Sequence, residues 1–184
     1  MNLKYLDISN NLFDLYDLDF SGMTKLTRLF INGGETSGMM DAQPIHKSLC
    51  LLVNLRELSF DMTKLSSLPD EIGNLVNLTC LCVDGSCLNE LPDSITKLTN
   101  LVELMAYGNG FEILPDDFGN LSSLKILSFQ ANCDILVLPT SFIKLTQLRD
   151  LALPGHESFV RPVGYAEFFV ELQKCECIYK ESDM

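Results

Sequence analysis

The sequence has no long apolar run and few cationic residues. No apolar stretch approaches the roughly eighteen residues that a membrane-spanning helix needs, and polar residues alternate with apolar ones directly after Met1, unlike a signal peptide. Thirteen Lys and Arg stand against 25 Asp and Glu, a net charge of −12. Such a charge repels nucleic-acid phosphates and anionic lipid headgroups. We therefore expect a soluble chain with no nucleic-acid and no membrane partner.

The cysteines also lack the pairing that secreted repeat proteins show. There are seven, an odd number scattered along the chain, so reduced thiols in a cytosol-like compartment fit best. Asn77 and Asn120 begin formal glycosylation triplets, but repeats rich in Asn, Leu and Ser produce such triplets readily. The prediction is a cytoplasmic protein, with extracellular residence as the alternative.

What the chain does have is a repeated pattern, Leu-x-x-Leu-x-Leu. It begins at Leu3, Leu26, Leu55, Leu78, Leu101, Leu124, Leu148 and, in a degraded form, Leu172. Subtracting successive positions gives intervals of 23, 29, 23, 23, 23, 24 and 24 residues. These lie in the range of leucine-rich repeats and outside those of tetratricopeptide, ankyrin and propeller repeats. The period predicts an α/β leucine-rich-repeat solenoid, a curved right-handed coil with a parallel concave β-sheet and short helical or extended convex segments.

Each repeat should form one coil of this solenoid. In the clearest unit Leu81 and Val83 alternate with Cys80 and Cys82, so a strand would turn the first pair inward and the cysteines outward. One coil cannot close its own core, so it stacks on its neighbours and their strands align in a sheet. We predict a single domain over residues 1–184 with about seven to eight coils.

The ninth position of the template usually carries Asn, whose amide satisfies backbone groups where adjacent coils turn. The residues at this position are Asn11, Gly34, Thr63, Ser86, Asn109, Asn132 and His156. Gly34 has no side chain and coincides with the longest repeat, whose extra residues we expect in an inserted loop over residues 35–47. Residues 160–184 are expected to form a C-terminal cap.

A second template, Leu-Pro-x-x-Ile/Phe, follows four of the strands. It begins at Leu68, Leu91, Leu114 and Leu138. This template resembles the 23-residue intracellular class of leucine-rich repeats found in plant Ras-group-related proteins, in Scribble-type scaffolds and in plant immune receptors. The resemblance implies a non-catalytic platform that binds proteins such as small GTPases, phosphatases or pathogen products. No polar cap precedes the first strand, so we expect a piece of a larger protein, or self-association through an uncapped N-terminal coil.

No catalytic or metal site is predicted. The pairs Cys80/Cys82 and Cys175/Cys177 lie about four coils apart and cannot share a metal ion. A nucleophilic pair of Cys133 and His156 would lack an orienting group and an oxyanion site. The acidic residues that follow the prolines are interpreted as structural, because they complement the positive end of a short helix. These residues are Asp70, Glu71, Asp93, Asp116 and Asp117. We predict no enzyme, no cofactor and no metal.

The candidate site is the outward face of the concave sheet. Met105, Tyr107 and Ile126 are outward apolar or aromatic residues that the core does not need, and acidic residues surround them. The predicted partner-binding residues are Phe30, Glu57, Asp61, Asp84, Glu103, Met105, Tyr107 and Ile126. The hypothesis is a protein-interaction module or signalling scaffold whose protein partner carries basic and apolar groups. The alternatives are the ligand-sensing region of a plant-type immune receptor and a substrate-recruiting arm of a larger enzyme.

Overall fold

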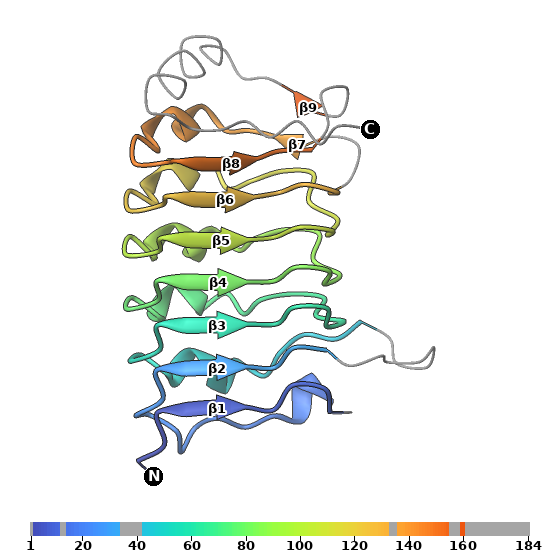
Figure 1. Cartoon of the computed structure of the whole chain (residues 1–184), viewed down its shortest axis with the longest axis vertical. Coiled ribbons are helices and arrows are strands. Elements are labelled where there is room, and N and C mark those ends of the chain that lie inside the picture. Colours follow the sequence, from blue (N-terminus) through green and yellow to red (C-terminus); the bar gives the residue numbers. More distant parts are fainter. Residues whose placement is uncertain (1, 12–13, 34–41, 133–135, 155–158, 161–184) are drawn as a thin grey trace.

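The computed structural model is a solenoid of stacked coils (Figure 1). It describes residues 2–11, 14–33, 42–132, 136–154 and 159–160. One sheet of seven parallel strands runs along the stack, in the order β1-β2-β3-β4-β5-β6-β8. Its strands are β1 (Tyr5–Asp7), β2 (Arg28–Phe30), β3 (Glu57–Ser59), β4 (Cys80–Cys82), β5 (Glu103–Met105), β6 (Ile126–Ser128) and β8 (Asp150–Ala152). The strands β7 (Leu136–Val137) and β9 (Phe159–Val160) pair with each other in a second sheet. The predicted leucine-rich-repeat solenoid is confirmed.

Short 3-10 helices lie behind the sheet, except the first, at residues 15–17, which lies beyond the end of β1 (Figure 1). In the described part of the chain they are η1 (Leu15–Asp17), η2 (Lys47–Leu51), η3 (Ile72–Asn74), η4 (Asp93–Lys97), η5 (Phe118–Asn120) and η6 (Thr140–Lys144). The sequence predicted either short helical or extended segments on the convex side, and the structure has 3-10 helices there. Prolines favour this outcome, since Pro92 and Pro139 supply the extended residue directly before η4 and η6.

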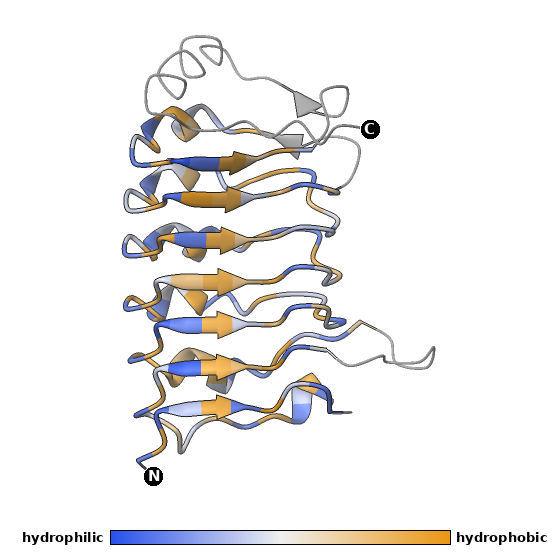
Figure 2. Cartoon of the chain, in the orientation of Figure 1, coloured by the Kyte–Doolittle hydropathy of each residue, from blue (hydrophilic) through white to orange (hydrophobic). Residues whose placement is uncertain are grey.

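The register of the sheet places the same template position of every coil side by side. Cys80 pairs with Glu103, Leu81 with Leu104, and Cys82 with Met105. The central leucine of each strand from Leu29 to Leu151 is at most 4 % exposed, and these leucines stack into one continuous core. Figure 2 shows this apolar column at the middle of the strands. Strand faces and register are therefore as predicted, because a shift by one residue would have moved every leucine into solvent.

The first coil is less well covered than those that follow. Leu3, Leu6 and Ile8 are only partly buried, whereas Leu78, Leu81 and Val83 of the β4 coil have no exposed surface. An inner coil has neighbours above and below, and burial of its apolar side chains is the main stabilising term of a solenoid. The first coil is thus packed less tightly than the inner coils.

Behind the sheet, two pairs of coils approach through a glycine and a serine. The amide of Gly119 donates to the hydroxyl oxygen of Ser141 at 3.0 Å, and the amide of Gly73 donates to that of Ser94 at 3.4 Å. A Cβ atom on Gly119 would lie 1.8 Å from the carbonyl oxygen of Ser141, and one on Gly73 would lie 2.4 Å from that of Ser94. Only glycine permits this closeness, so these residues determine how tightly η3 packs on η4 and η5 on η6.

The expected insert and cap fall largely outside the described residues. Residues 34–41, which include Gly34, and residues 161–184 lie outside the described residues. Cys133 and His156 also lie outside them. Residues 42–47 follow the path of a coil, because Gln43 forms a parallel bridge with Leu65 and Ile45 is 3 % exposed. Among the helices that the structure describes, none has the length and apolar character needed to cross a bilayer.

Candidate functional site

The candidate site lies on the outward face of the strands and on the turns that follow them. Met105 and Ile126 project from β5 and β6 at positions that alternate with the buried leucines, and both are half-buried. Tyr107 follows β5 and is 50 % exposed. The pairings Cys82–Met105 and Glu103–Ile126 set each apolar side chain beside a thiol or a carboxylate of the previous strand. The structure thus brings together the three apolar residues that the sequence selected.

Carboxylates border this patch on the β3 and β4 side. Asp61 and Asp84 follow β3 and β4, and ligand atoms of both lie within 4.8 Å of each other and of the Cys82 sulfur. Burial raises the pKa of the Asp84 carboxyl, and the charge of Asp61 raises it further, although the Tyr107 amide donates to Asp84 Oδ1 at 2.7 Å. Two carboxylates this close repel each other, so the position favours a positively charged neighbour.

These three side chains are also the described group closest to a metal-ligand arrangement. Burial raises the pKa of the Cys82 thiol, which keeps it protonated at neutral pH. The two carboxylates and the thiol offer three ligand atoms, fewer than the roughly four of a structural zinc site or the roughly six of a calcium or magnesium site. The chemistry of this group therefore fits a cationic side chain better than a metal ion.

Cys80 and Cys82 differ from the surface thiols that the sequence predicted, because both are half-buried. The Cys80 thiol donates to Glu103 Oε2 at 3.7 Å, and Glu57 pairs with Cys80 from the other side. Burial, followed by the charge of Glu103, raises the pKa of Cys80 to about 12. In the register of the sheet Cys80 lies between Glu57 and Glu103, and Cys82 lies between Ser59 and Met105. The two cysteines therefore lie between the acidic and apolar parts of the face.

Phe30 lies apart from the other predicted site residues. Phe30 is on β2, and the centre of its ring lies 5.7 Å from the centre of the Tyr5 ring on β1. The Arg28 guanidinium carbon lies 5.1 Å from the centre of the Tyr5 ring. Two strands, β3 and β4, separate this cluster from Met105. The sequence analysis missed Tyr5 and Arg28, although both share a template position with Glu57 and Ile126 and could have been found by inspecting that column for a cation beside aromatic rings.

The turns after the strands position the ends of this face. The amide group of Asn109 donates to the carbonyl oxygen of Val83 at 2.8 Å and its Oδ1 accepts from the Leu88 amide at 3.1 Å. Asn132 repeats both contacts one coil later, with Ala106 at 2.9 Å and Phe111 at 3.3 Å. Each Asn therefore fixes its own turn against the preceding coil, as expected of the ninth position.

Comparison with known proteins gives matches to one kind of repeat. Residues 35–158, more than half of the chain, match the family model described as leucine-rich repeat region, and residues 2–23 match the model described as Leucine Rich Repeat. No curated protein matches the sequence.

Several solved structures share the fold. The chain is 32% identical, with a TM-score of 0.66, to the crystal structure of PEPR1-AtPEP1, covering 78% of this chain and 20% of that one. It is 27% identical, with a TM-score of 0.64, to the ectodomain of the Arabidopsis thaliana membrane receptor kinase GASSHO1/SCHENGEN3 in complex with CASPARIAN STRIP INTEGRITY FACTOR 2, covering 74% and 16%. A protein of Leptospira interrogans, LIC12759, is 22% identical with a TM-score of 0.59, covering 79% and 41%, and shows the fold alone. The chain spans less than half the length of each of these three proteins.

Proposed function

The chain belongs to the leucine-rich-repeat family, and from this membership we propose that it is a protein-interaction module that binds a polypeptide segment on its concave sheet. The family commonly mediates protein–protein interaction, and its fold is generally non-catalytic. We extend both properties to this chain, as a module without an active site of its own.

One observation carries the proposal: Met105 and Ile126 point outward where the fold makes no demand for apolar side chains. At the template position of Met105 three other strands carry polar residues, namely Asp7, Ser59 and Ser128, and three carry Phe30, Cys82 and Ala152, so the fold accepts polar residues there. Apolar side chains in the centre of a concave face, flanked by polar groups, have the arrangement of an interaction hot spot.

The chemistry of the partner follows from the border of the patch. Asp61, Asp84 and Glu103 place negative charge beside Met105, so the partner should contribute a Lys or Arg next to an apolar side chain. A structural relative supports a bound partner on this kind of repeat, because the GASSHO1/SCHENGEN3 ectodomain, 27% identical, is in complex with CASPARIAN STRIP INTEGRITY FACTOR 2.

Selection from a displayed library of random peptides tests the proposal. Peptides that bind the wild-type chain should be enriched in Lys or Arg beside apolar residues, and counter-selection with a Met105→Ala/Ile126→Ala chain should remove most of them. Calorimetry on selected peptides should show a loss of about 1–3 kcal/mol for each single substitution, because a few apolar anchors carry most of the affinity. Asp84→Asn should weaken binding mainly at low salt.

The matched control is Ile143→Ala on η6, an apolar residue that is 47 % exposed behind the sheet. It should leave affinity unchanged, and thermal melts should agree for all variants. Selected peptides that bind the Met105→Ala/Ile126→Ala chain as tightly as the wild type would refute the concave site.

We also propose a cytoplasmic location. The described cysteines Cys50, Cys80, Cys82 and Cys87 are free, as expected in a reducing compartment. Imaging of a fluorescent fusion of the full-length protein tests this, and a secreted or surface-exposed signal would contradict it.

A further inference from the structure

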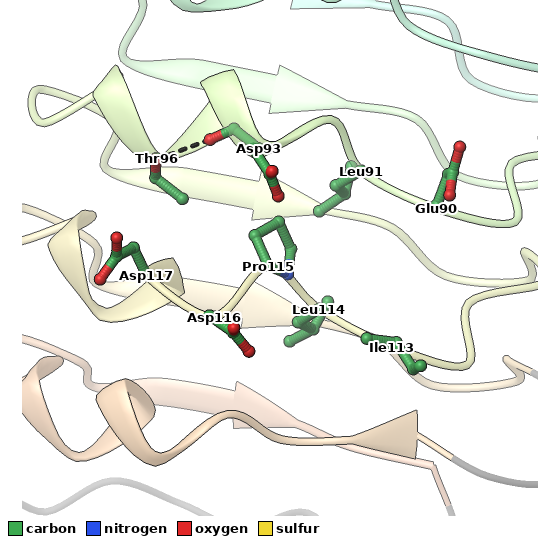
Figure 3. A pocket seen from close by; sticks show the side chains of 9 residues that line it. All are labelled: Glu90, Leu91, Asp93, Thr96, Ile113, Leu114, Pro115, Asp116 and Asp117. Atoms are coloured by element: carbon green, nitrogen blue, oxygen red, sulfur yellow. Dashed lines mark hydrogen bonds between the residues drawn. The ribbon is translucent and has the colours of Figure 1, made fainter.

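A groove on the back of the solenoid lies between the corners of the β4 and β5 coils. It has a volume of about 560 Å³ and runs from Glu90 and Ile113 at one end to Thr96 and Asp117 at the other (Figure 3). Leu91 and Leu114, both nearly buried, lie between the two ends. The groove is separate from the concave face, because its residues follow the turns and lead into η4 and η5 behind the sheet.

A close-packing contact that both flanking interfaces have is absent between η4 and η5. Gly73 meets Ser94 between η3 and η4, and Gly119 meets Ser141 between η5 and η6. At the equivalent positions between η4 and η5 the sequence has Thr96 in place of the glycine and Asp117 in place of the serine. The Thr96 hydroxyl donates to the carbonyl oxygen of Asp93 within its own helix at 2.7 Å. A threonine and an aspartate cannot approach as closely as a glycine and a serine, so the corner stays open.

An exposed isoleucine forms one lip of this groove. Ile113 precedes the Leu-Pro corner of its coil and is 63 % exposed. The residues at the same position in the two preceding coils are Ser67 and Glu90, both exposed and polar. The fold therefore does not need an apolar side chain there, and Ile113 is available to a ligand.

The charge of the groove has one sign. Four of its nine lining residues are carboxylates, namely Glu90, Asp93, Asp116 and Asp117, and none of the nine is Lys, Arg or His. Asp117 precedes η5 without forming a side-chain capping bond, so its carboxylate is not used to start that helix. Such a rim attracts a cation, whereas the chain itself, with a net charge of −12, is a poor occupant of its own groove.

We propose that this back groove, lined by Ile113 and Pro115 with Glu90, Asp93, Asp116 and Asp117, is a second docking surface for a partner protein's extended segment in which Lys or Arg flanks an apolar side chain. The apolar side chain packs on the exposed Ile113, and the cations meet the carboxylates on the two coils. With the concave face this gives the module two independent contact surfaces, so that one chain can hold two segments at once.

Fluorescence anisotropy with a short labelled peptide, Lys-Leu-Pro-Lys-Leu-Lys, tests the groove on the full chain. Ile113→Ser, which copies Ser67, should raise the Kd roughly tenfold, as expected for loss of a central apolar anchor. Asp93→Asn/Asp116→Asn should raise it by a similar factor at low salt. Thr96→Gly/Asp117→Ser, which copies the closed interfaces on either side, should also weaken binding while leaving the thermal melt intact.

The controls separate this site from net charge and from the concave face. Asp70→Asn/Glu71→Gln removes two charges at the matching corner of the β3 coil and should leave the Kd nearly unchanged. Ile143→Ser should do the same for an exposed apolar residue elsewhere. Equal weakening by both pairs of acid substitutions, loss of binding in Met105→Ala/Ile126→Ala, or no binding by the wild-type chain at about millimolar concentration would each overturn the proposal.

Discussion

The turn after the strand is held differently in two neighbouring parts of the solenoid. In the β5 and β6 coils, Asn109 and Asn132 each donate to a carbonyl oxygen of the preceding coil and accept from one of its amides. In the β3 and β4 coils the same position carries Thr63 and Ser86, whose hydroxyls lie 3.3 Å apart and both donate to the carbonyl oxygen of Phe60. A hydroxyl bears one hydrogen, so it cannot bridge as many backbone groups as an amide.

The border between these two parts is also where the proposed binding surfaces lie. On the concave face, Asp84 of the hydroxyl part accepts from the amide of Tyr107 in the asparagine part. On the back, the groove opens between Thr96 and Asp117, one from each part. Asn109 still bonds the β5 coil to the β4 coil across this border. What the border lacks is the glycine–serine contact behind the sheet, which the interfaces between η3 and η4 and between η5 and η6 both have.

The largest expected effect distinguishes the asparagine bonds of the β5 and β6 coils from the hydroxyl bonds of the β3 and β4 coils. Asn109→Ala should lower the free energy of unfolding by about 2–4 kcal/mol, because it leaves buried donors and acceptors of two coils without partners. Ser86→Ala should cost only about 1 kcal/mol, since Thr63 still donates to Phe60. Urea unfolding of both variants measures the difference. Equal losses would show that the amide and the hydroxyl contribute alike and that the two parts do not differ in stability.

Much of this comparison could be predicted from the sequence. The leucine period predicted the sheet, its register and the inward position of residues such as Leu81, because every coil of a solenoid repeats the same strand and turn. The ninth position identified Asn109 and Asn132 as bridging residues. Met105 and Ile126 followed from the same alternation, since outward residues are those that the core does not use.

Other features depend on contacts between coils, which the period does not encode. The half-burial of Cys80 depends on its neighbours on the adjacent strands, Glu57 and Glu103. The groove near Ile113 required knowing that Gly119 meets Ser141 and that Thr96 cannot do the same. How closely two coils pack depends on pairs of residues about 22 positions apart, such as Gly119 and Ser141. The repeat template describes each coil separately and does not pair these residues.

A smaller effect should be shared by the two parts. The residue before the ninth template position has a left-handed backbone in both parts. It is Met62, with φ 55°, in the hydroxyl part and Ala131, with φ 53°, in the asparagine part. Met62→Gly and Ala131→Gly should each raise the free energy of unfolding by about 0.5–1 kcal/mol, because side chains strain this conformation. Gly108→Ala, with no atom within 3.7 Å of the new Cβ, should cost about 1 kcal/mol for the same reason. Opposite signs at Met62 and Ala131 would show that the turns differ in backbone strain as well as in their side chains.

The acidic border should make stability depend on pH through Asp84. Its pKa is raised by burial and by Asp61, so the folded state holds the proton more tightly than the unfolded state. The contribution of Asp84 is therefore most favourable below the usual carboxyl pKa of 3.8 and is lost as the pH rises through the folded value. Asp84→Asn should remove this decline while keeping an acceptor for the Tyr107 amide. Urea unfolding from about pH 3 to about pH 7 measures it, with exposed Asp150→Asn as a control of equal charge. A decline that persists in Asp84→Asn would contradict the assignment.

The smallest effect is kinetic, and it uses the thiols of the hydroxyl part as probes of local opening. Burial raises the pKa of Cys80 to about 12, whereas Cys87 in the same coil is exposed. Because the thiolate is the reactive form, iodoacetamide at neutral pH should modify Cys87 well before Cys80. If Ser86 helps to hold the β4 coil closed, Ser86→Ala should speed modification of Cys80 more than Asn132→Ala does, because opening of a coil is local in a solenoid. Peptide mapping by mass spectrometry resolves each cysteine. Faster modification of Cys80 in Asn132→Ala than in Ser86→Ala would mean that the two parts open as one unit. The asparagine and hydroxyl parts would then differ in their hydrogen bonds but not in how they open.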